Sequence, residues 1–477
     1  MLRSSAAKLL WSILLVLALV AGACGNDDDR GTTEPAPVAT ATAEATSAPT
    51  EAPAPEPTAE PEPTAEPTPE ATPAPTEAPA PEPTAEPEPT AEPTPEATPA
   101  PEPDTHPSGL DVGAINAAAA DWMEAAGIPG LVLAVAHGDE EPWTFGWGVS
   151  DVVTEEPMTP GQYVRIGSVT KPVTTVAVLS LVEEGLLDLD TPVTAYLGDD
   201  WYGTYEHGPD ITLRHLMGHT AGFVEYAFDP GFFILASARL SVPITPGEIV
   251  RFTTTYGPVA DFEIEYNYST AGHVIAGMII EAVTGNPAHV EIRSRVLEPL
   301  GLQNTYLPPG ELPPVPVANS YNGGLLYSAF SSLTRVPDEA RHNYLGNDYI
   351  STNSYSQELL QTAGWTGGGI ETLIGDVPTM FRGLFAGGLI SDESLAEMTT
   401  PSVNPGYGLG VGIDDIDGRL AYSHGGGTPA FSTRVIYFPE LDLTLAANAN
   451  VLPPEPGVGE LMDVLIPIVM ESWGLAG

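Results

Sequence analysis

The chain has 477 residues, with 64 acidic side chains against 15 lysines and arginines and a formal net charge of −49. Such acidity argues against binding to nucleic acid or anionic lipid headgroups, because both repel a negatively charged surface. The only cysteine is Cys24, so a disulfide framework within one molecule is excluded.

Residues 1–24 have the pattern of a secretory signal peptide, with a basic start, an apolar run over Leu9–Val20 and small residues before Cys24. The apolar run is shorter than the about 20 residues of a transmembrane helix. The position of Cys24 resembles the lipobox of bacterial lipoproteins, in which the cysteine is lipidated, although Ala21 stands where leucine is usual. We predict a lipoprotein held by its N-terminal lipid on the outer face of the bacterial cell membrane. Plain secretion and an uncleaved anchor are the alternatives.

Residues 25–107 are predicted to form a disordered stalk rich in proline, alanine, threonine and glutamate. The 26-residue block Pro53–Ala78 begins again at Pro79. This composition has too few apolar side chains to offset the entropy lost on ordering, and proline favours the extended polyproline II conformation. We predict a spacer that holds a domain away from a membrane, with a solvating linker that has no partner as the alternative.

Residues 108–477 form the predicted globular domain, with 45 acidic and 12 basic side chains and a formal charge of −33. Strand patterns occur near both ends, and the middle is mostly helical. We expect an α+β fold: an antiparallel sheet built from the N- and C-terminal parts, flanked by helices, with an inserted helical subdomain. The expected helices are 111–126, 173–184 and 459–473, and the expected strands are 131–136, 143–149, 408–413, 420–424, 433–438 and 443–448.

Lys171 is the only lysine after the predicted signal peptide, and it follows Ser168 by three residues. Arginine stays protonated, whereas a desolvated lysine can lose its proton and act as a base. Ser168 stands where a helix should begin, so free backbone N–H groups there suit an oxyanion. Lowering the lysine pKa from about 10.4 to about 7 takes roughly 4–5 kcal/mol, which burial can supply. The alternative is a serine helix cap beside a solvated lysine.

Four motifs occur in order along the chain: Arg165-Ile166-Gly167-Ser168-Val169-Thr170-Lys171, Ile211–Gly222, Tyr268-Ser269-Thr270-Ala271-Gly272-His273 and His424-Gly425-Gly426-Gly427-Thr428-Pro429. Together they resemble the motifs of the serine β-lactamase and penicillin-binding-protein superfamily. The resemblance covers about 110–475 and is strongest to class C β-lactamases, serine D-Ala-D-Ala carboxypeptidases and related esterases.

The resemblance implies a role for each motif. Ser168 is acylated, Lys171 takes its proton, and Tyr268 relays a proton to the leaving group and activates water. The N–H groups of Ser168 and Gly427 form the oxyanion hole. The substrate side is lined by Thr270, His424 and Gly426. The resemblance implies no organic cofactor and no metal.

Two departures from the family pattern bear on the substrate. Thr270 stands where the family carries an asparagine, although Asn267 offers an alternative register. Gly425 and Gly427 stand where D-Ala-D-Ala carboxypeptidases often carry threonines. Both favour an esterase or broad amidase over a strict carboxypeptidase. Placement in the cell envelope argues the other way, since peptidoglycan stem peptides lie within reach of the stalk.

His215 and His219, four residues apart, could form a metal pair. Gly218 between them and the absence of an acidic partner favour structural packing.

The main hypothesis is an envelope-tethered serine acyl hydrolase acting on an ester, an amide or a D-Ala-D-Ala-type peptide. A non-catalytic peptidoglycan- or envelope-binding module on the same fold is the second, and Thr270 supports it. A structural adhesin is the third and rests only on the stalk.

Overall fold

The computed structural model describes residues 109–229, 231–232, 243–323, 338–354, 356–428, 430–452 and 456–475. The predicted signal peptide with Cys24, the predicted stalk and Pro429 of the fourth motif lie outside the described residues. Within the described ranges, no helix is both long and apolar enough to cross a membrane.

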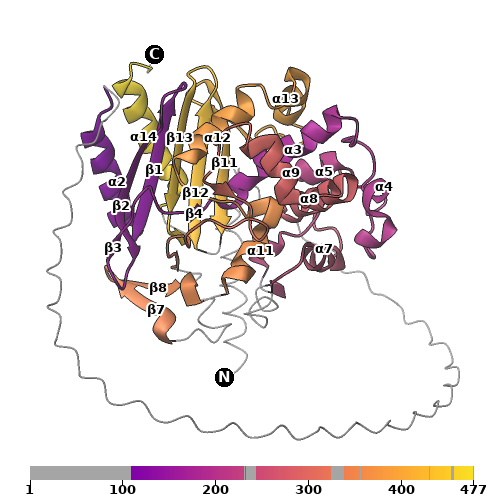
Figure 1. Ribbon diagram of the computed structural model, residues 1–477, viewed down its shortest axis with the longest axis horizontal. Coiled ribbons are helices and arrows are strands. Elements are labelled where there is room, and N and C mark those ends of the chain that lie inside the picture. The colour runs from indigo at the N-terminus through magenta and orange to yellow at the C-terminus, as the bar shows by residue number, and fades with distance from the viewer. Residues whose placement is uncertain are drawn as a thin grey trace, which may run out of the picture. The chain divides into compact units, whose positions relative to one another are not determined.

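A seven-stranded antiparallel sheet joins the two ends of the described domain (Figure 1). Its strand order is β10-β11-β12-β13-β1-β2-β3, so the C-terminal β13 pairs with the N-terminal β1, with Leu133 opposite Ala447. The strands are β1 (Gly130–His137), β2 (Trp143–Asp151), β3 (Glu156–Pro157), β10 (Gly412–Ile416), β11 (Arg419–Thr428), β12 (Phe431–Phe438) and β13 (Leu443–Ala449). This pairing confirms the predicted sheet from the two termini.

Each face of the sheet buries its own apolar core, because successive strand residues point to opposite faces. Leu131 and Leu133 of β1 join the core with α2 (Val112–Ala126) and α14 (Val458–Ser472). Val132 and Ala134 join the larger core that contains α3 (Thr170–Glu183) and α12 (Asp376–Phe385). Asp111 caps α2 by accepting from the N–H of Ala114 at 2.9 Å. The helices predicted over 111–126 and 459–473 are confirmed within one residue at each end.

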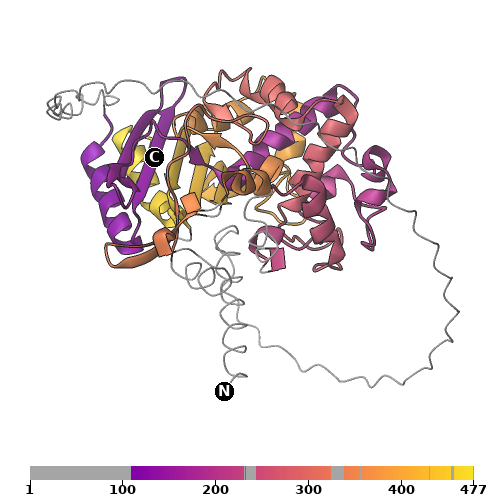
Figure 2. The same ribbon diagram turned by 60° about the horizontal axis from the view of Figure 1, so that its bottom comes forward.

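The inserted part is mostly helical and gathers on one side of the large sheet (Figure 2). Its other helices are α4 (Thr194–Leu197), α5 (Leu213–Met217), α7 (Pro246–Thr255), α8 (Ala271–Thr284), α9 (Ala288–Ile292), α11 (Gln357–Gly368) and α13 (Asp392–Thr399). Short helical turns are η1 (Gly167–Val169), η2 (Asp199–Trp201), η3 (Tyr226–Phe228), η4 (Arg293–Leu297), η5 (Asp338–Ala340) and η6 (Thr352–Ser354). One small sheet has the strand order β4 (Val164–Arg165), β9 (Glu371–Thr372) and β5 (Thr305–Tyr306). A second small sheet has the order β14 (Val451–Leu452), β6 (Tyr321–Asn322), β8 (Asn347–Ser351) and β7 (Arg341–Tyr344).

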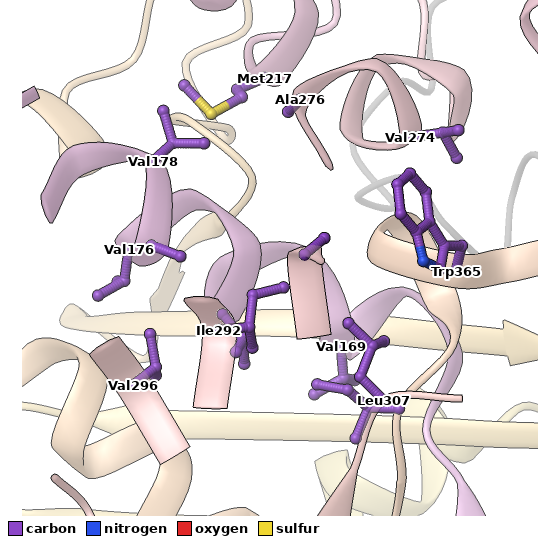
Figure 3. Packing of buried hydrophobic residues seen from close by; sticks show 14 of the residues in the cluster. Val169, Val176, Val178, Met217, Val274, Ala276, Ile292, Val296, Leu307 and Trp365 are labelled. Atoms are coloured by element: carbon purple, nitrogen blue, oxygen red, sulfur yellow. The ribbon is translucent and has the colours of Figure 1, made fainter. Parts of the chain in front are cut away.

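The larger core fixes α3 among the inserted helices. Val176 and Val178 of α3 belong to the same apolar cluster as Val296 of η4, Ala276 of α8 and Trp365 at the break in α11 (Figure 3). Burial on nearly every side explains why α3 has no polar face. The helix begins at Thr170, three residues earlier than predicted, so Lys171 lies in its first turn.

The strand predicted over 408–413 is confirmed only at its C-terminal end, because the structure has the strand at Gly412–Ile416. Gly410 has φ +71°, a left-handed conformation that interrupts an extended strand. The N–H groups of Leu409 and Gly410 donate to Met398 (2.8 Å) and Met217 (3.0 Å), both in the helical part. The strand therefore starts only at Gly412, and the preceding glycine-rich segment connects the sheet to the helices.

Candidate active site

Ser168 lies in the tight turn η1 that leads into α3, and its side chain is buried. Gly167 has φ +55°, and a Cβ there would lie 2.8 and 2.9 Å from the carbonyl oxygen and nitrogen of Gly427. The turn therefore requires glycine, both for its left-handed backbone and for the close approach of β11. The hydroxyl of Thr170 donates to the carbonyl of Gly167 at 2.7 Å and holds the turn in place.

Lys171 is completely buried beside Ser168. Its Nζ lies 2.9 Å from Oγ of Ser168, 3.2 Å from Oγ1 of Thr270 and 2.8 Å from the carbonyl oxygen of Gly367. A neutral amine has two N–H donors and one lone pair. If the donors are directed to Gly367 and Thr270, the lone pair is left for the hydroxyl proton of Ser168. An ammonium would donate to all three oxygens, whereas the neutral amine could accept from Ser168, so the contact with Ser168 is compatible with proton transfer to Lys171.

The carbonyl of Gly367 is available because α11 is interrupted just before it. Trp365 has φ 38° and ψ −129°, which breaks the helix. Carbonyls in the last turn of a helix have no intrahelical partner. Here α3 supplies the partners: Lys171 donates to Gly367, and the hydroxyl of Thr174 donates to the carbonyl of Thr366 at 2.7 Å.

Tyr268 lies directly before α8, with the centroid of its ring 4.8 Å from Nζ of Lys171. The alternative register through Asn267 does not place its amide here, because that Nδ2 donates to the carbonyl of Phe223 at 2.5 Å. Thr270 reaches Nζ through its hydroxyl. Tyr268 and Thr270 are thus the residues of this motif that lie beside Lys171.

Glu225 is a carboxylate close to this group that the sequence analysis missed. Its Oε2 accepts from the N–H of Thr270 at 2.6 Å, and its Oε1 accepts from the N–H of Ala227 at 2.9 Å. Burial raises the pKa of Glu225, while the charge of Lys171 and the two N–H donors act in the opposite direction. The net effect is a pKa above the usual value, so burial outweighs these groups, and the carboxyl lies two hydrogen bonds from the lysine through Thr270.

Strand β11 brings backbone atoms against the other side of Ser168. Strand β10 pairs with β11 only as far as Ser423, so residues 424–428 form an edge that β10 does not cover. A Cβ on Gly426 would lie 1.9 Å from the carbonyl oxygen of Ile166, so only glycine fits there. The peptide of Gly427 faces Gly167, next to Ser168. The two predicted oxyanion donors therefore lie on segments in direct contact.

His424 is buried on this edge, and its Nε2 lies 2.9 Å from the hydroxyl of Tyr407. Burial, reinforced by the charge of Lys171, lowers the pKa of His424 to about 3. The imidazole is therefore neutral at physiological pH. Tyr407, which lies directly before the glycine-rich segment that leads into β10, is a residue of this site that the motifs do not predict.

The two histidines considered as a metal pair have separate partners. Nδ1 of His215 lies 3.1 Å from the N–H of Thr212, and its Nε2 lies 3.2 Å from a carboxylate oxygen of Glu263. Nδ1 of His219 instead accepts from the N–H of Ser269 at 3.2 Å. Among the described residues, no cluster of three or more histidine, cysteine, aspartate or glutamate side chains could hold a metal ion.

The chain is similar in sequence to a known protein family and to several curated proteins. A family model described as Beta-lactamase matches residues 115–465. Penicillin-binding protein 4* of Bacillus subtilis (strain 168) is 24% identical over 330 residues, which cover 67% of this chain and 68% of that protein. Several other curated relatives are matched over less than two thirds of their own length.

Solved structures share the fold. A D-stereospecific amidohydrolase from Streptomyces sp. has a TM-score of 0.57 and 28% identity, covering 70% of this chain and 94% of that chain. The D-amino acid amidase of Ochrobactrum anthropi SV3, solved with D-phenylalanine, has a TM-score of 0.62 and 24% identity, covering 76% and 99% of the two chains.

Proposed function

Since the chain belongs to the beta-lactamase family of serine hydrolases, we propose that Ser168 is its nucleophile and Lys171 its general base. The observation that carries the proposal is the 2.9 Å distance between Nζ of the fully buried Lys171 and Oγ of Ser168. A serine is activated when its hydroxyl lies within hydrogen-bond reach of a base and further groups orient that base.

The reaction has two steps. Oγ of Ser168 attacks the carbonyl carbon of the substrate, and its proton passes to Lys171. The N–H groups of Ser168 and Gly427 stabilise the oxyanion, and the alcohol or amine leaves with a proton relayed through Tyr268. A water molecule activated by Tyr268 then attacks the acyl-enzyme, and its proton is passed through Tyr268 and Lys171 to Oγ of Ser168 as the acid leaves.

We propose esters and amides with a free amino group next to the scissile carbonyl as the preferred substrates. Glu225 is the reason for this proposal: it is a buried carboxyl next to Thr270, and its ionised form would attract an ammonium. The Streptomyces and Ochrobactrum relatives are named for D-stereospecific amide hydrolysis and D-amino acids, which suggests the D configuration.

A strict D-Ala-D-Ala carboxypeptidase is less well supported. Gly425 and Gly427 carry no hydroxyl that could hold a terminal carboxylate, and the methyl group of Thr270 packs against Gly367, where a Cβ would lie 2.7 Å from it. The domain charge of −33 also repels an anionic peptide.

The test is a panel run on the full-length chain: a short-chain p-nitrophenyl ester, D-phenylalanine amide, a D-Ala-D-Ala peptide and a cephalosporin. We expect turnover of the ester and the amide, abolished by Ser168→Ala. If none is turned over and no acyl-enzyme forms, the non-catalytic envelope-binding module becomes the better account.

We further propose that Cys24 is lipidated and that residues 25–107 hold the domain away from the membrane. The sequence pattern before Cys24 supports this. Cys24→Ala should move the protein from the membrane fraction to the medium. An unchanged distribution would contradict the anchor.

A further inference from the structure

A line of hydrogen bonds connects the backbone N–H of Ser269 to the backbone carbonyl of Gly425 through the side chains of His219, Tyr407 and His424. The N–H of Ser269 lies 3.2 Å from Nδ1 of His219. Nε2 of His219 lies 3.3 Å from the hydroxyl of Tyr407, which lies 2.9 Å from Nε2 of His424. Nδ1 of His424 lies 2.5 Å from the carbonyl of Gly425. The three side chains are buried, so these bonds do not compete with bulk water.

The direction of every bond in this line is fixed by its two ends. The N–H of Ser269 can only donate, so Nδ1 of His219 accepts and its Nε2 carries the proton. The carbonyl of Gly425 can only accept, so Nδ1 of His424 carries the proton and its Nε2 accepts. Tyr407 must therefore accept from His219 and donate to His424, which is what one hydroxyl can do.

Both imidazoles have to be neutral for this pattern, since an imidazolium presents two donors. Burial is the largest of the causes that lower the pKa of His219 well below its usual value. The pKa of His424 falls to about 3, mainly because of burial. The pattern is consistent with the electrostatics of the site at neutral pH.

The ends of the line adjoin two groups of the proposed mechanism. Ser269 directly follows Tyr268, and Gly425 lies two residues before Gly427. The ring of Tyr268 also lies 4.3 Å from that of His219, centroid to centroid. One end therefore fixes the segment that carries the proton relay, and the other fixes the strand that supplies an oxyanion donor.

The backbone at His219 is held in a conformation that needs support. His219 has φ 57°, a left-handed value that costs energy for a residue with a side chain. It persists where surrounding contacts over-determine it. The bonds of His219 to Ser269 and Tyr407 supply such contacts.

We propose that Tyr407 is a positioning residue that holds the two sides of the site at a fixed separation through His219 and His424. The proposal rests on the function proposed above. Tyr407 touches neither substrate nor Ser168 in this account. Its effect falls on the transition state, which needs the proton relay and the oxyanion donor together.

The test compares Tyr407→Phe, which keeps the ring and removes only the hydroxyl, with wild type and with Tyr437→Phe. Tyr437 is a buried tyrosine of β12 whose hydroxyl donates to Asp442 at 3.2 Å. With the p-nitrophenyl ester, Tyr407→Phe should lower kcat roughly ten- to hundredfold and leave KM within about twofold. Tyr437→Phe should match wild type. A folded Tyr407→Phe variant with wild-type kcat, or one that raises only KM, would overturn the proposal.

A second measurement does not depend on activity. Nitrogen-15 spectra of the imidazoles in the full-length chain should show His219 with its proton on Nε2 and His424 with its proton on Nδ1. The opposite tautomer at His424 would overturn the proposal even in an active enzyme. If wild type turns over no substrate, the proposed function fails, and the tautomers still decide whether the line of bonds exists.

Discussion

The two sides of the candidate site approach Ser168 with different kinds of atoms. On the lysine side, made of Lys171, Thr270 and Gly367, Nζ of one side chain collects three polar contacts. On the strand side, made of Gly426 and Gly427, only backbone atoms come close, and a Cβ on Gly426 would collide with Ile166. The lysine side needs particular side chains to make its polar contacts. The strand side needs glycine, because a side chain would keep its backbone from approaching Ser168.

Lys171→Arg should have the largest effect. Arginine keeps the positive charge but cannot act as a base, so the lysine side loses its proton acceptor. We expect kcat/KM for the p-nitrophenyl ester to fall about a thousandfold or more. Circular dichroism serves as the folding control. An active, folded Arg variant would show that the lysine side does not work as described.

Gly426→Ala tests the strand side. The added methyl group would lie 1.9 Å from the carbonyl oxygen of Ile166, so β11 has to move away from Ser168. Losing one oxyanion donor costs about 10²–10³-fold in kcat, and we expect a loss of that order. Gly459→Ala, in α14 with nothing within 4 Å, is the matched control and should keep full activity. Wild-type rates for Gly426→Ala would exclude the strand from catalysis.

Glu225→Gln sharpens the role of charge on the lysine side. The substitution removes the negative charge and leaves one acceptor oxygen, which can serve the N–H of Thr270 or that of Ala227 but not both. We expect the preference for D-phenylalanine amide over its N-acetyl derivative to fall about tenfold, because the acetyl group removes the ammonium. Kinetics with both substrates measure the ratio. An unchanged ratio would leave Glu225 as a structural cap only.

His273, behind the lysine side, should set part of the pH dependence of stability. It is completely buried, and burial lowers its pKa well below 6.5. Below pH 6.5 the unfolded chain therefore binds a proton that the folded chain does not, and stability falls as pH falls. Between pH 6 and 4, the free energy of unfolding of wild type should drop by about 1.4 kcal/mol per pH unit more than that of His273→Asn. Equal slopes in denaturant titrations would contradict this.

Features that depend on local sequence patterns were predicted, whereas features that depend on contacts between distant segments were not. The antiparallel sheet and its flanking helices follow from periodic apolar patterns, and Ser168 with Lys171 follows from two residue types at a fixed spacing. These signals are local. The segment 408–413 was misread because its apolar residues fill the larger core while Gly410 turns the backbone away from the sheet.

Glu225, Gly367 and Tyr407 were not predicted, because each acts through a contact between distant segments. The carbonyl of Gly367 lies 196 positions along the chain from Lys171, and no residue type marks a carbonyl. Tyr407 depends on His219, which follows α5 in the helical insertion, and on His424, which lies on β11 of the large sheet. A single sequence contains these residues but does not show that they are in contact in the folded chain.

The central claim is that Lys171 activates Ser168 for acylation, and intact-mass analysis after treatment with a fluorophosphonate tests it most directly. Wild type should gain one adduct, located on Ser168 by peptide mapping. Ser168→Ala should gain none, and Lys171→Arg should react at least about a hundred times more slowly. An adduct on Ser168→Ala, or an equal rate for Lys171→Arg, would contradict the account.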